Sequence, residues 1–334
     1  MKKKINVAVV GATGLVGRKI LQVLEERNFP IESIKLYASH KSAGNTLRFQ
    51  EKTHVVKDIE ASDFSDIDIA LFSAGNFVSE KYVPKAAGQG CIVIDNGSFW
   101  RMNPEVPLIV PEVNPEMIIG NHGIIANPNC STIQLVVALK PIADNFGLKR
   151  VVVSTYQAIS GAGQVGVSQL MSEINGELPE SRISSNQLAF NTVFHTIKDN
   201  IGFSIEELKM IDETRKILAL PKLPLAVTCV RIPVLNGHAE SVNIETEKPF
   251  TIFELKEVLG KSLGIELVDD PINEVYPTPL MVENKDEVFI GRIRKDESIE
   301  NGAYLWVVSD NLRKGAATNA VQIAEKVLES MVNG

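Results

Sequence analysis

The sequence predicts an α/β protein with two domains: a Rossmann-type parallel-sheet domain, followed by an α+β domain with a mixed or antiparallel sheet. The first observation behind this prediction is length, because 334 residues exceed what one hydrophobic core usually spans. The second is that short runs rich in Val and Ile alternate with helix-like segments in the first part of the chain. The third is that longer, partly alternating runs replace them in the second part. Hydrophobic residues make up 44% and charged residues 22%, which is typical of a folded globular chain.

Five short apolar runs predict the strands of the first domain, at residues 5–10, 33–37, 67–72, 91–94 and 123–126. Between the first two, residues 15–26 carry apolar side chains at helical spacing, so this stretch predicts a strand–helix–strand unit. Strands that are hydrophobic throughout are typical of a parallel sheet with both faces covered. We therefore expect a Rossmann-like domain over residues 1–127.

Five longer runs predict the strands of the second domain, at residues 151–157, 228–233, 242–246, 289–294 and 303–309. The run 242–246 alternates apolar and polar side chains, as a half-exposed antiparallel strand does. One face of such a sheet needs a cover, which a second subunit can provide, and this catalytic and dimerisation domain is expected over residues 128–311. The last segment, 312–334, predicts an amphipathic helix that completes the first domain. Pro141 is expected to kink or end the helix after Cys130.

Net charge and cysteine content exclude several classes of protein. A net charge of −7 argues against general binding to nucleic acid or anionic membranes, which requires basic surface. No stretch reaches the roughly 18 apolar residues of a membrane span, and glycines and charges follow the first apolar run, unlike in an export signal. Cys91, Cys130 and Cys229 are far apart and odd in number, so neither a disulfide framework nor a metal site is indicated. We expect a cytoplasmic protein without a bound metal.

Three glycines follow the first predicted strand and open the first predicted helix. They are Gly11, Gly14 and Gly17, in the pattern G-x-x-G-x-x-G. In this position glycines allow a tight turn and let the backbone approach a pyrophosphate at the helix N-terminus. The spacing differs from G-x-G-x-x-G, and a plain glycine turn is the alternative. The context favours a dinucleotide site.

The end of the second predicted strand bears on which dinucleotide is bound. An NAD site usually offers Asp or Glu there for the ribose 2′-hydroxyl. This strand ends at Ser39 without a carboxylate, and Lys41 and Ser42 follow. Hydroxyls and a cation suit a 2′-phosphate, so NADP is favoured over NAD. A solvated surface loop is the alternative.

Cys130 lies in the segment 127–132, Asn-Pro-Asn-Cys-Ser-Thr, between a predicted strand and a predicted helix. A thiol at a helix N-terminus meets the positive end of the helix dipole, which lowers its pKa and favours the thiolate. Cys91 and Cys229 lie in apolar runs, where cysteine is usually a small buried hydrophobic residue. Cys130 is therefore the candidate nucleophile. A thiolate beside a nicotinamide suggests aldehyde oxidation through a thioester, or the reverse reduction of an activated acyl group.

That chemistry needs a group that moves the thiohemiacetal proton. His238 follows Arg231 by seven positions and directly precedes an alternating strand, so a cation and an imidazole flank one short connection. The other histidines lie in polar or loop surroundings without a partner that the sequence reveals: His40, His54, His122 and His195. His238 is the candidate acid/base residue, with a purely structural histidine as the alternative.

Together these motifs resemble the aspartate-semialdehyde dehydrogenase family, in family order and along the whole chain. The matching motifs are Gly-Ala-Thr-Gly-Leu-Val-Gly at 11–17, Ser-Phe-Trp-Arg at 98–101, Asn-Pro-Asn-Cys-Ser-Thr at 127–132, Thr-Tyr-Gln-Ala-Ile-Ser-Gly-Ala-Gly at 155–163, Glu-Thr-Arg-Lys at 213–216, and Arg231 with His238. The resemblance implies NADPH-dependent reduction of L-4-aspartyl phosphate to L-aspartate 4-semialdehyde and phosphate through a cysteine thioester. It also implies a homodimer and a place in lysine, threonine, methionine and diaminopimelate biosynthesis.

The resemblance implies a role for each matching residue. Cys130 is similar to the family nucleophile and His238 to the acid/base residue. Gln157 is similar to the residue that orients the acyl intermediate, and Arg231 to the one that grips the substrate α-carboxylate. The other implied substrate contacts are Glu213 for the α-ammonium group and Arg101 and Lys216 for the phosphate. The implied NADP contacts are Gly11, Thr13, Gly14, Leu15, Val16, Ser39, Lys41, Ser42, Ser160, Gly161 and Asn311.

Three other functions compete with this one. N-acetyl-glutamyl-phosphate reductase has similar cofactor segments, but its cysteine motif typically runs Gly-Cys-Tyr-Pro-Thr, and its acetylated substrate needs no carboxylate for the nitrogen. Phosphorylating glyceraldehyde-phosphate dehydrogenases share the thioester chemistry but are expected to carry the acid for NAD that is missing here. A non-catalytic NADP-binding paralogue would not need to keep both Cys130 and His238.

Overall fold

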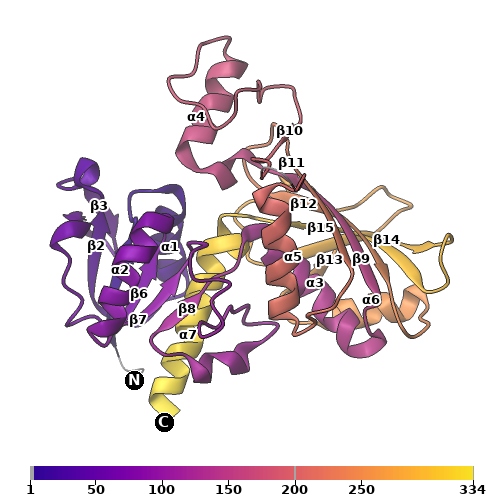
Figure 1. Ribbon diagram of the computed structural model, residues 1–334, viewed down its shortest axis with the longest axis horizontal. Helices are drawn as coiled ribbons and strands as arrows, with labels where there is room; N and C mark the ends of the chain where they lie inside the picture. Colours follow the sequence, from indigo (N-terminus) through magenta and orange to yellow (C-terminus); the bar gives the residue numbers. More distant parts are fainter. Residues whose placement is uncertain (1–3, 199–200, 334) are drawn as a thin grey trace. The chain divides into compact units, whose positions relative to one another are not determined.

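The computed structural model describes residues 4–198 and 201–333. The chain forms two compact units, one of residues 1–129 with 316–334 and the other of residues 130–315. The outermost residues of the expected first domain and of its terminal helix, 1–3 and Gly334, lie outside the described residues. Each unit is built around its own sheet (Figure 1).

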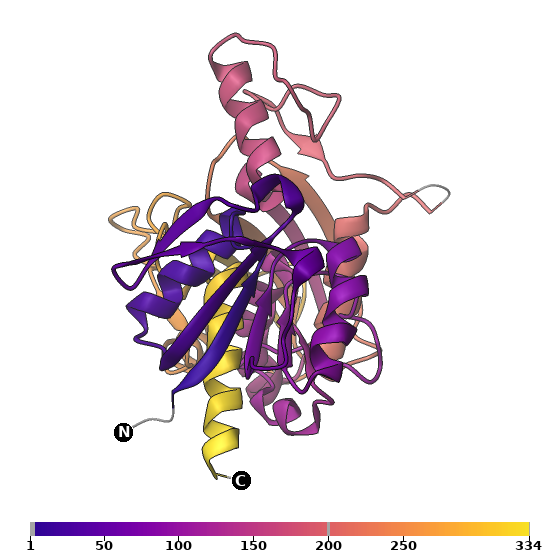
Figure 2. The same cartoon turned by 90° about the vertical axis from the view of Figure 1, so that its left-hand side faces the viewer.

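The first unit is a six-stranded parallel sheet with helices on both faces (Figures 1 and 2). In sheet order its strands are β5 (Lys57–Asp58), β2 (Ile31–Ala38), β1 (Ile5–Val10), β6 (Ile69–Phe72), β7 (Ile92–Asp95) and β8 (Ile124–Ala126). Its helices are α1 (Leu15–Glu26), α2 (Asn76–Gly88) and α7 (Thr318–Asn333). The predicted Rossmann-type sheet is confirmed.

Two hydrophobic clusters cover the two faces of this sheet. One joins alternate residues of β1 to the apolar stripes of α1 and α7, for example Val9, Leu24 and Val321. The other joins the opposite strand face to α2, through residues such as Phe72 and Val83. The amphipathic pattern of the terminal helix therefore reflects burial against the parallel sheet.

Several short elements of the first unit were not predicted. They are the hairpin of β3 (Thr46–Phe49) and β4 (Lys52–Val55), strand β5, helix α2, and 3₁₀ turns at His40–Ser42, Ile59–Ala61 and Pro115–Gly120. The turn at His40–Ser42 follows β2 directly, where the sequence predicts a loop for the cofactor.

The second unit is a seven-stranded mixed sheet (Figure 1). In sheet order its strands are β10 (Val193–Phe194), β11 (Leu225–Arg231), β9 (Arg150–Gln157), β12 (His238–Glu245), β15 (Gly302–Ser309), β14 (Val288–Asp296) and β13 (Ile265–Leu267). β11 pairs with β9, and β13 with β14, in parallel, whereas the other pairs are antiparallel. The expected mixed or antiparallel sheet is thus a mixed one.

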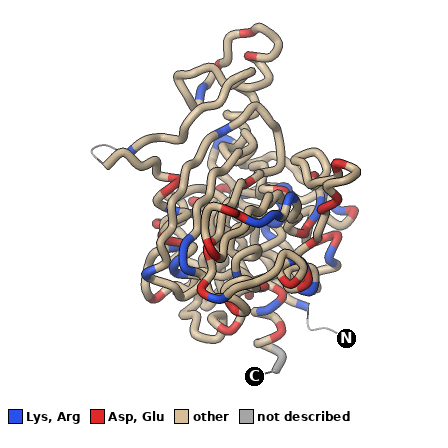
Figure 3. Tube along the Cα trace, turned by 90° about the vertical axis from the view of Figure 1, so that its right-hand side faces the viewer, with Lys and Arg blue, Asp and Glu red and all other residues tan. Residues whose placement is uncertain are grey.

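Three helices cover one face of this sheet: α3 (Cys130–Phe146), α5 (Ile205–Ile217) and α6 (Ile252–Gly260). The remaining elements are the 3₁₀ turn Ile159–Ala162, helix α4 (Gly163–Ile174) and a π-helical turn at Arg313–Ala317. On the opposite sheet face, side chains such as Tyr156, Ser241 and Trp306 stay partly exposed. Figure 3 shows acidic and basic residues interspersed along the chain rather than gathered by sign.

The helix that begins at Cys130 does not end at Pro141. α3 continues to Phe146 with Pro141 in its interior. A proline there removes a backbone hydrogen bond and costs about 3 kcal/mol. Ten α3 residues between Ser131 and Ile142 are buried, and this tertiary packing outweighs the local cost. None of the helices in the described part of the chain is long and apolar enough to cross a membrane.

Candidate active site

Cys130 and His238 meet in the second unit, although 108 positions separate them in the sequence. Cys130 is the first residue of α3 and His238 the first residue of β12. The distance between Sγ of Cys130 and Nε2 of His238 is 3.1 Å. The structure thus joins a thiol at a helix N-terminus to a buried imidazole, the two groups that the sequence suggests separately.

A second hydrogen bond determines which nitrogen of His238 carries the proton. The backbone N–H of Ala158 donates to Nδ1 at 3.0 Å, so Nδ1 is an unprotonated acceptor. Burial lowers the pKa of His238 to about 3, and the positive charge of Arg231 acts in the same direction. The ring is therefore neutral near pH 7, and its proton lies on Nε2, directed at the sulfur.

Two glycines leave the space that this pair needs. A Cβ atom on Gly315 would lie 2.9 Å from Cβ of Cys130, closer than real Cβ atoms approach. A Cβ atom on Gly161 would lie 3.2 Å from two atoms of the His238 ring. Both positions therefore favour glycine for reasons of space around the pair.

Gln157 and Arg231 lie at the same end of neighbouring parallel strands. They are the last residues of β9 and β11 and are directly paired in the strand register. Gln157 is buried, and its Nε2 donates to Oγ1 of Thr155 at 3.3 Å and to Oε1 of Glu206 at 3.4 Å. The Arg231 side chain contacts the carbonyl oxygen of Ala158 at 3.5 Å. An amide and a guanidinium thus flank the residue that holds His238.

Ser160, Gly161 and Asn311 lie beside His238 in the second unit. The Asn311 side chain donates to Oγ of Ser160 at 3.0 Å and accepts the backbone N–H of Gly237 at 2.9 Å. Gly237 directly precedes His238, and a Cβ atom on Gly161 would lie 3.2 Å from its ring. The structure brings these three predicted cofactor residues together.

The predicted cofactor residues of the first unit lie at the carboxyl ends of β1 and β2. Gly11 adopts a φ of 82°, and a Cβ atom there would lie 2.2 Å from the carbonyl oxygen of Ser73. A Cβ on Gly17 would lie 2.1 Å from the carbonyl oxygen of Gly11. Gly14 caps α1 without a side-chain hydrogen bond, so the first N–H groups of α1 are available to an anion. These features suit a pyrophosphate.

The rest of this group surrounds that helix start or follows β2. Thr13, Leu15 and Val16 are partly exposed at the start of α1. Ser39 and Lys41 are exposed, and Ser42 is half-buried, at the 3₁₀ turn after β2. Because β1 and β2 are adjacent parallel strands, both groups lie at the carboxyl end of the sheet.

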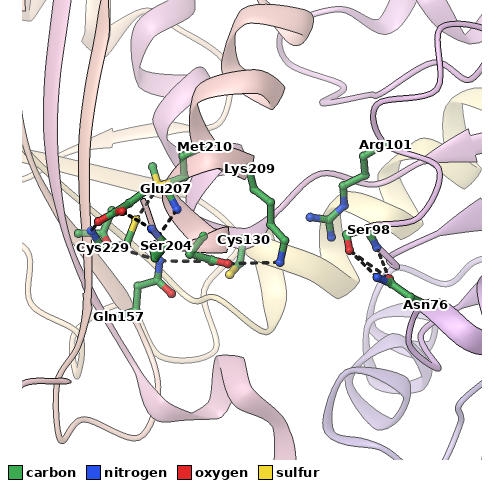
Figure 4. A network of polar contacts seen from close by, with 12 residues as sticks. Asn76, Ser98, Arg101, Cys130, Gln157, Ser204, Glu207, Lys209, Met210 and Cys229 are labelled. Carbon is green, nitrogen blue, oxygen red and sulfur yellow. Dashed lines mark hydrogen bonds and ion pairs between the residues drawn. The ribbon is translucent and has the colours of Figure 1, made fainter. Parts of the chain in front are cut away.

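Arg101 belongs to the first unit and is held by its own loop. It is buried, and its Nη2 donates to the carbonyl oxygen of Asn96 at 2.7 Å. The same loop is fixed by hydrogen bonds between Asn76 and Ser98 (Figure 4). Asp95 accepts the N–H of Gly97 at 2.9 Å, which orders the start of the loop. Within the described residues, no group of three or more His, Cys, Asp or Glu residues could hold a metal ion.

Two family models match this chain. The model described as "Semialdehyde dehydrogenase, NAD binding domain" matches residues 6–120, and "Semialdehyde dehydrogenase, dimerisation domain" matches residues 139–314. The aspartate-semialdehyde dehydrogenase of Aquifex aeolicus is 53% identical, over 97% of this chain and 98% of its own length. That of Bacillus subtilis is 46% identical over 98% of each.

The chain belongs to the aspartate-semialdehyde dehydrogenase family. It is accordingly an oxidoreductase with an NAD-binding domain and a dimerisation domain. The structure of aspartate semialdehyde dehydrogenase II from Vibrio cholerae, complexed with ASA, has a TM-score of 0.94 and 47% identity. It covers 98% of this chain and 99% of its own. The family of N-acetyl-glutamyl-phosphate reductases and a non-catalytic role are not favoured by these matches.

Glu213 and Lys216, two residues that the family resemblance suggested, lie on α5 beyond Glu206, the α5 residue that contacts Gln157. They lie in the second half of α5, where Glu213 is buried. Burial lowers the pKa of Lys216, and the negative charge of Glu213 opposes that shift. Glu206 lies seven residues earlier on the same helix, about 10 Å away along its axis.

Glu206 and Lys209 are two charged residues of α5 that lie at the site. Glu206 accepts from Gln157, and its other oxygen lies 3.4 Å from Nζ of Lys209. The charge of Glu206 also acts on Arg231 and His238. The motif Glu-x-x-Lys occurs twice on α5, so its sequence alone did not distinguish the copies. The capping box of Ser204 and Glu207 marks the start of α5 in the sequence. The first Glu-x-x-Lys motif, Glu206 to Lys209, lies at this start.

His195 is a second residue that the sequence did not connect to the site. Burial lowers its pKa to about 4, with Arg231 acting in the same direction and Glu206 against it. Within the described part of the chain, its Nε2 is buried without a hydrogen-bond partner. A neutral imidazole therefore lies within electrostatic range of the Arg231 and Glu206 charges.

Proposed function

We propose that this chain catalyses the reversible, NADPH-dependent conversion of L-4-aspartyl phosphate to L-aspartate 4-semialdehyde and phosphate, through a thioester on Cys130. The observation that carries the proposal is the 3.1 Å contact between Cys130 and a His238 ring whose proton faces the sulfur. The reaction serves the biosynthesis of lysine, threonine, methionine and diaminopimelate. The Vibrio cholerae relative complexed with ASA supports this substrate class.

The first step is attack of the Cys130 thiolate on the acyl phosphate. Three features favour the thiolate: the N-terminus of α3, the Nε2–H of His238, and the positive charge of Arg231, which interacts with Cys130. A C–S bond forms, the bond between the acyl carbon and the phosphate oxygen breaks, and phosphate leaves with the electron pair.

In the second step the thioester carbon is reduced. Bound NADPH supplies the hydride. The Nε2–H of His238 donates a hydrogen bond to the thiohemiacetal alkoxide, and the C=O bond forms again as the C–S bond breaks and returns its electron pair to Cys130. In this step His238, to which the resemblance gives the acid/base role, acts through the N–H on its Nε2. Gln157 orients the acyl group during both steps.

Charges around the pair select the substrate. Arg231 suits the α-carboxylate, because a guanidinium can bind it with two hydrogen bonds. Glu206 suits the α-ammonium group and Lys209 an anionic oxygen, and we assign them the roles that the resemblance gave to Glu213 and Lys216. Arg101, from the first unit, remains our proposed phosphate ligand.

NADP is the proposed dinucleotide. The glycine turn of residues 11–17 offers the pyrophosphate site, and Ser39, Lys41 and Ser42 offer hydroxyls and a cation at the end of β2. Ser160, Gly161 and Asn311 would contact the nicotinamide end beside His238. The Candida albicans enzyme, which was solved with NADP, has a TM-score of 0.77 and 25% identity to this chain.

A cytoplasmic homodimer is the proposed assembly, formed through the open face of the mixed sheet. Aromatic and basic side chains gather there, with Tyr156 against Trp306 and Arg294 over Tyr304. Part of this face lines a hollow of about 650 Å³. Replacing Trp306 by Glu should convert the dimer to a monomer in light scattering at unchanged fold. A dimer that survives this change would refute the assignment of the face.

The proposed function is tested by mixing purified protein with aspartate semialdehyde, phosphate and NADP and following NADPH absorbance. We expect NADPH to form only when phosphate is present. Reduction of NADP that is independent of phosphate would contradict the acyl-phosphate product.

A further inference from the structure

Glu240 is a buried acid on β12, the strand that begins with His238. It follows His238 by two residues on β12, so both side chains point to the same face of the sheet, the one that α3 covers. Glu240 is 0% exposed. Among the described residues, neither of its carboxyl oxygens has a hydrogen-bond partner.

Burial and the side chain of Gln134 are the influences on the ionisation of this acid. Its strand neighbours are Thr155 on β9 and Val307 on β15. The titratable groups nearest to it along the strands are the thiol of Cys229 on β11 and the neutral ring of His238. Burial raises the pKa of Glu240 well above its usual range, since an isolated buried carboxylate is far more costly than the neutral acid.

The polar group that faces Glu240 is the amide of Gln134. Gln134 is fully buried on α3, four residues and so one turn after Cys130. Its Oε1 accepts from Oγ of Ser309 at 2.8 Å. Its Nε2 has no other partner among the described residues, and the Gln134 side chain acts on the Glu240 carboxyl, where it opposes the effect of burial on the pKa. Ser309 in turn is paired with His238 across β15 and β12. One buried amide thus joins the helix that carries Cys130 to the strands that carry His238.

We propose that Glu240 is a positioning residue which, as a neutral carboxylic acid, holds Gln134 and thereby fixes the first turns of α3, keeping Cys130 within reach of His238. The neutral form matters, because a carboxylate at this place would disfavour the thiolate of Cys130. The inference rests on the proposed role of Cys130 as nucleophile.

The experiment compares wild type with Glu240→Gln and Glu240→Ala, and with Glu245→Gln as the matched control on the same strand. Glu245 pairs with Lys149 at 2.5 Å, so its removal changes a surface ion pair only. Three properties are measured: the melting temperature from about pH 5 to pH 9, the rate of Cys130 alkylation by iodoacetamide, and kcat.

A neutral Glu240 predicts a specific pH trend. Its folded pKa lies above its unfolded pKa, so wild-type stability falls as pH rises past the unfolded value, and Gln removes this fall. The melting temperature of Glu240→Gln relative to wild type should therefore rise with pH, whereas that of Glu245→Gln should not. In infrared difference spectra at about pH 8, wild type should show a protonated carboxyl band that Glu240→Gln lacks. A melting-temperature difference between Glu240→Gln and wild type that does not change with pH, or the absence of the protonated carboxyl band, would contradict a neutral Glu240.

The positioning role of Glu240 predicts a second difference, between Glu240→Gln and Glu240→Ala. Glu240→Gln should keep the alkylation rate and kcat within about threefold of wild type, and Glu240→Ala should lose about tenfold or more in both. Equal rates in all three proteins would overturn the positioning role. If Glu240→Ala does not fold, Gln134→Leu provides the same test from the helix side, with the same expected loss. Alkylation needs no substrate, so failure of the proposed dehydrogenase activity leaves this readout intact.

Discussion

The imidazole of His238 lies between a sulfur and a backbone donor: Sγ of Cys130 is 3.1 Å from Nε2, and the N–H of Ala158 donates to Nδ1 at 3.0 Å. With both nitrogens engaged, the neutral ring can only carry its proton on Nε2. The pair is therefore arranged as a hydrogen-bond donor facing a sulfur, rather than as a base waiting to receive the thiol proton.

This arrangement predicts how variants of His238 rank. Glutamine can place an N–H near the position of Nε2, whereas alanine cannot. We expect His238→Ala to lose at least about a hundredfold in kcat, and His238→Gln to retain at least about tenfold more activity than His238→Ala. Steady-state kinetics of both variants checks this. Equal losses in the two would favour a proton-accepting role instead.

The pH dependence of kcat/KM follows from the same hydrogen bonds. With the pKa of His238 lowered to about 3, the ring does not titrate between about pH 5 and pH 8. We expect that kcat/KM of the wild type does not change near pH 6.5 through titration of His238. A change near pH 6.5 that is present in the wild type and absent in His238→Gln would contradict a neutral His238.

Stability should depend on His195 in a defined direction. Its folded pKa of about 4 lies below the usual value of 6.5, so the unfolded chain binds an extra proton between these values. This contribution to stability is complete above about pH 6.5 and is lost as pH falls toward 4. Urea unfolding of wild type and His195→Gln at about pH 7 and pH 5 should show a smaller pH effect in the variant. An equal pH effect in both proteins would show that His195 is not buried in its neutral form.

The three cysteines should differ in reactivity. Burial raises the pKa of Cys91 to about 12 and also raises that of Cys229, so neither offers thiolate at neutral pH. Mass spectrometry after brief treatment of native protein with iodoacetamide should find label on Cys130 alone. Cys130→Ala should remain unlabelled, and label on Cys91 or Cys229 in the folded protein would contradict their burial.

The two Glu-x-x-Lys pairs of α5 can be separated by kinetics. Glu206→Gln and Lys209→Met should raise KM for aspartate semialdehyde by about tenfold or more, because each removes a charge from the site. Lys216→Met should leave KM within about twofold, with melting temperatures measured to exclude unfolding. A larger KM effect in Lys216→Met than in Lys209→Met would return the substrate role to the second pair.

The cofactor turn after β2 gives a prediction about specificity. Lys41 is exposed, so its replacement by alanine should not disturb the fold. We expect Lys41→Ala, combined with Ser42→Ala, to raise KM for NADPH by about tenfold while KM for NADH changes little. Parallel changes for both dinucleotides would place these residues away from the 2′-phosphate.

Much of the fold could be predicted because local pattern and burial agree. The apolar run of β1, the glycine turn and the helical spacing of α1 identify the first β–α unit without tertiary information. The hairpin of β3 and β4 escaped prediction because its strands are short and largely exposed. The continuation of α3 beyond Pro141 depends on tertiary burial, which a local rule does not contain.

In the candidate site, too, some residues follow from local sequence signals and others only from the tertiary structure. Cys130 stands out from its sequence neighbours, and its position at the start of α3 follows from local signals. The involvement of Glu206, His195 and Glu240 depends instead on which strand ends and helix turns meet in space. The sequence of α5 holds two Glu-x-x-Lys motifs, and the contact of Glu206 with Gln157 distinguishes the first of them.

The most direct test of the central claim is the formation of NADPH from aspartate semialdehyde, phosphate and NADP by wild type and by Cys130→Ala. The thioester mechanism on Cys130 predicts phosphate-dependent turnover in wild type and none above background in the variant. Turnover that persists undiminished in Cys130→Ala, or wild-type protein that is inactive with this substrate, would contradict it.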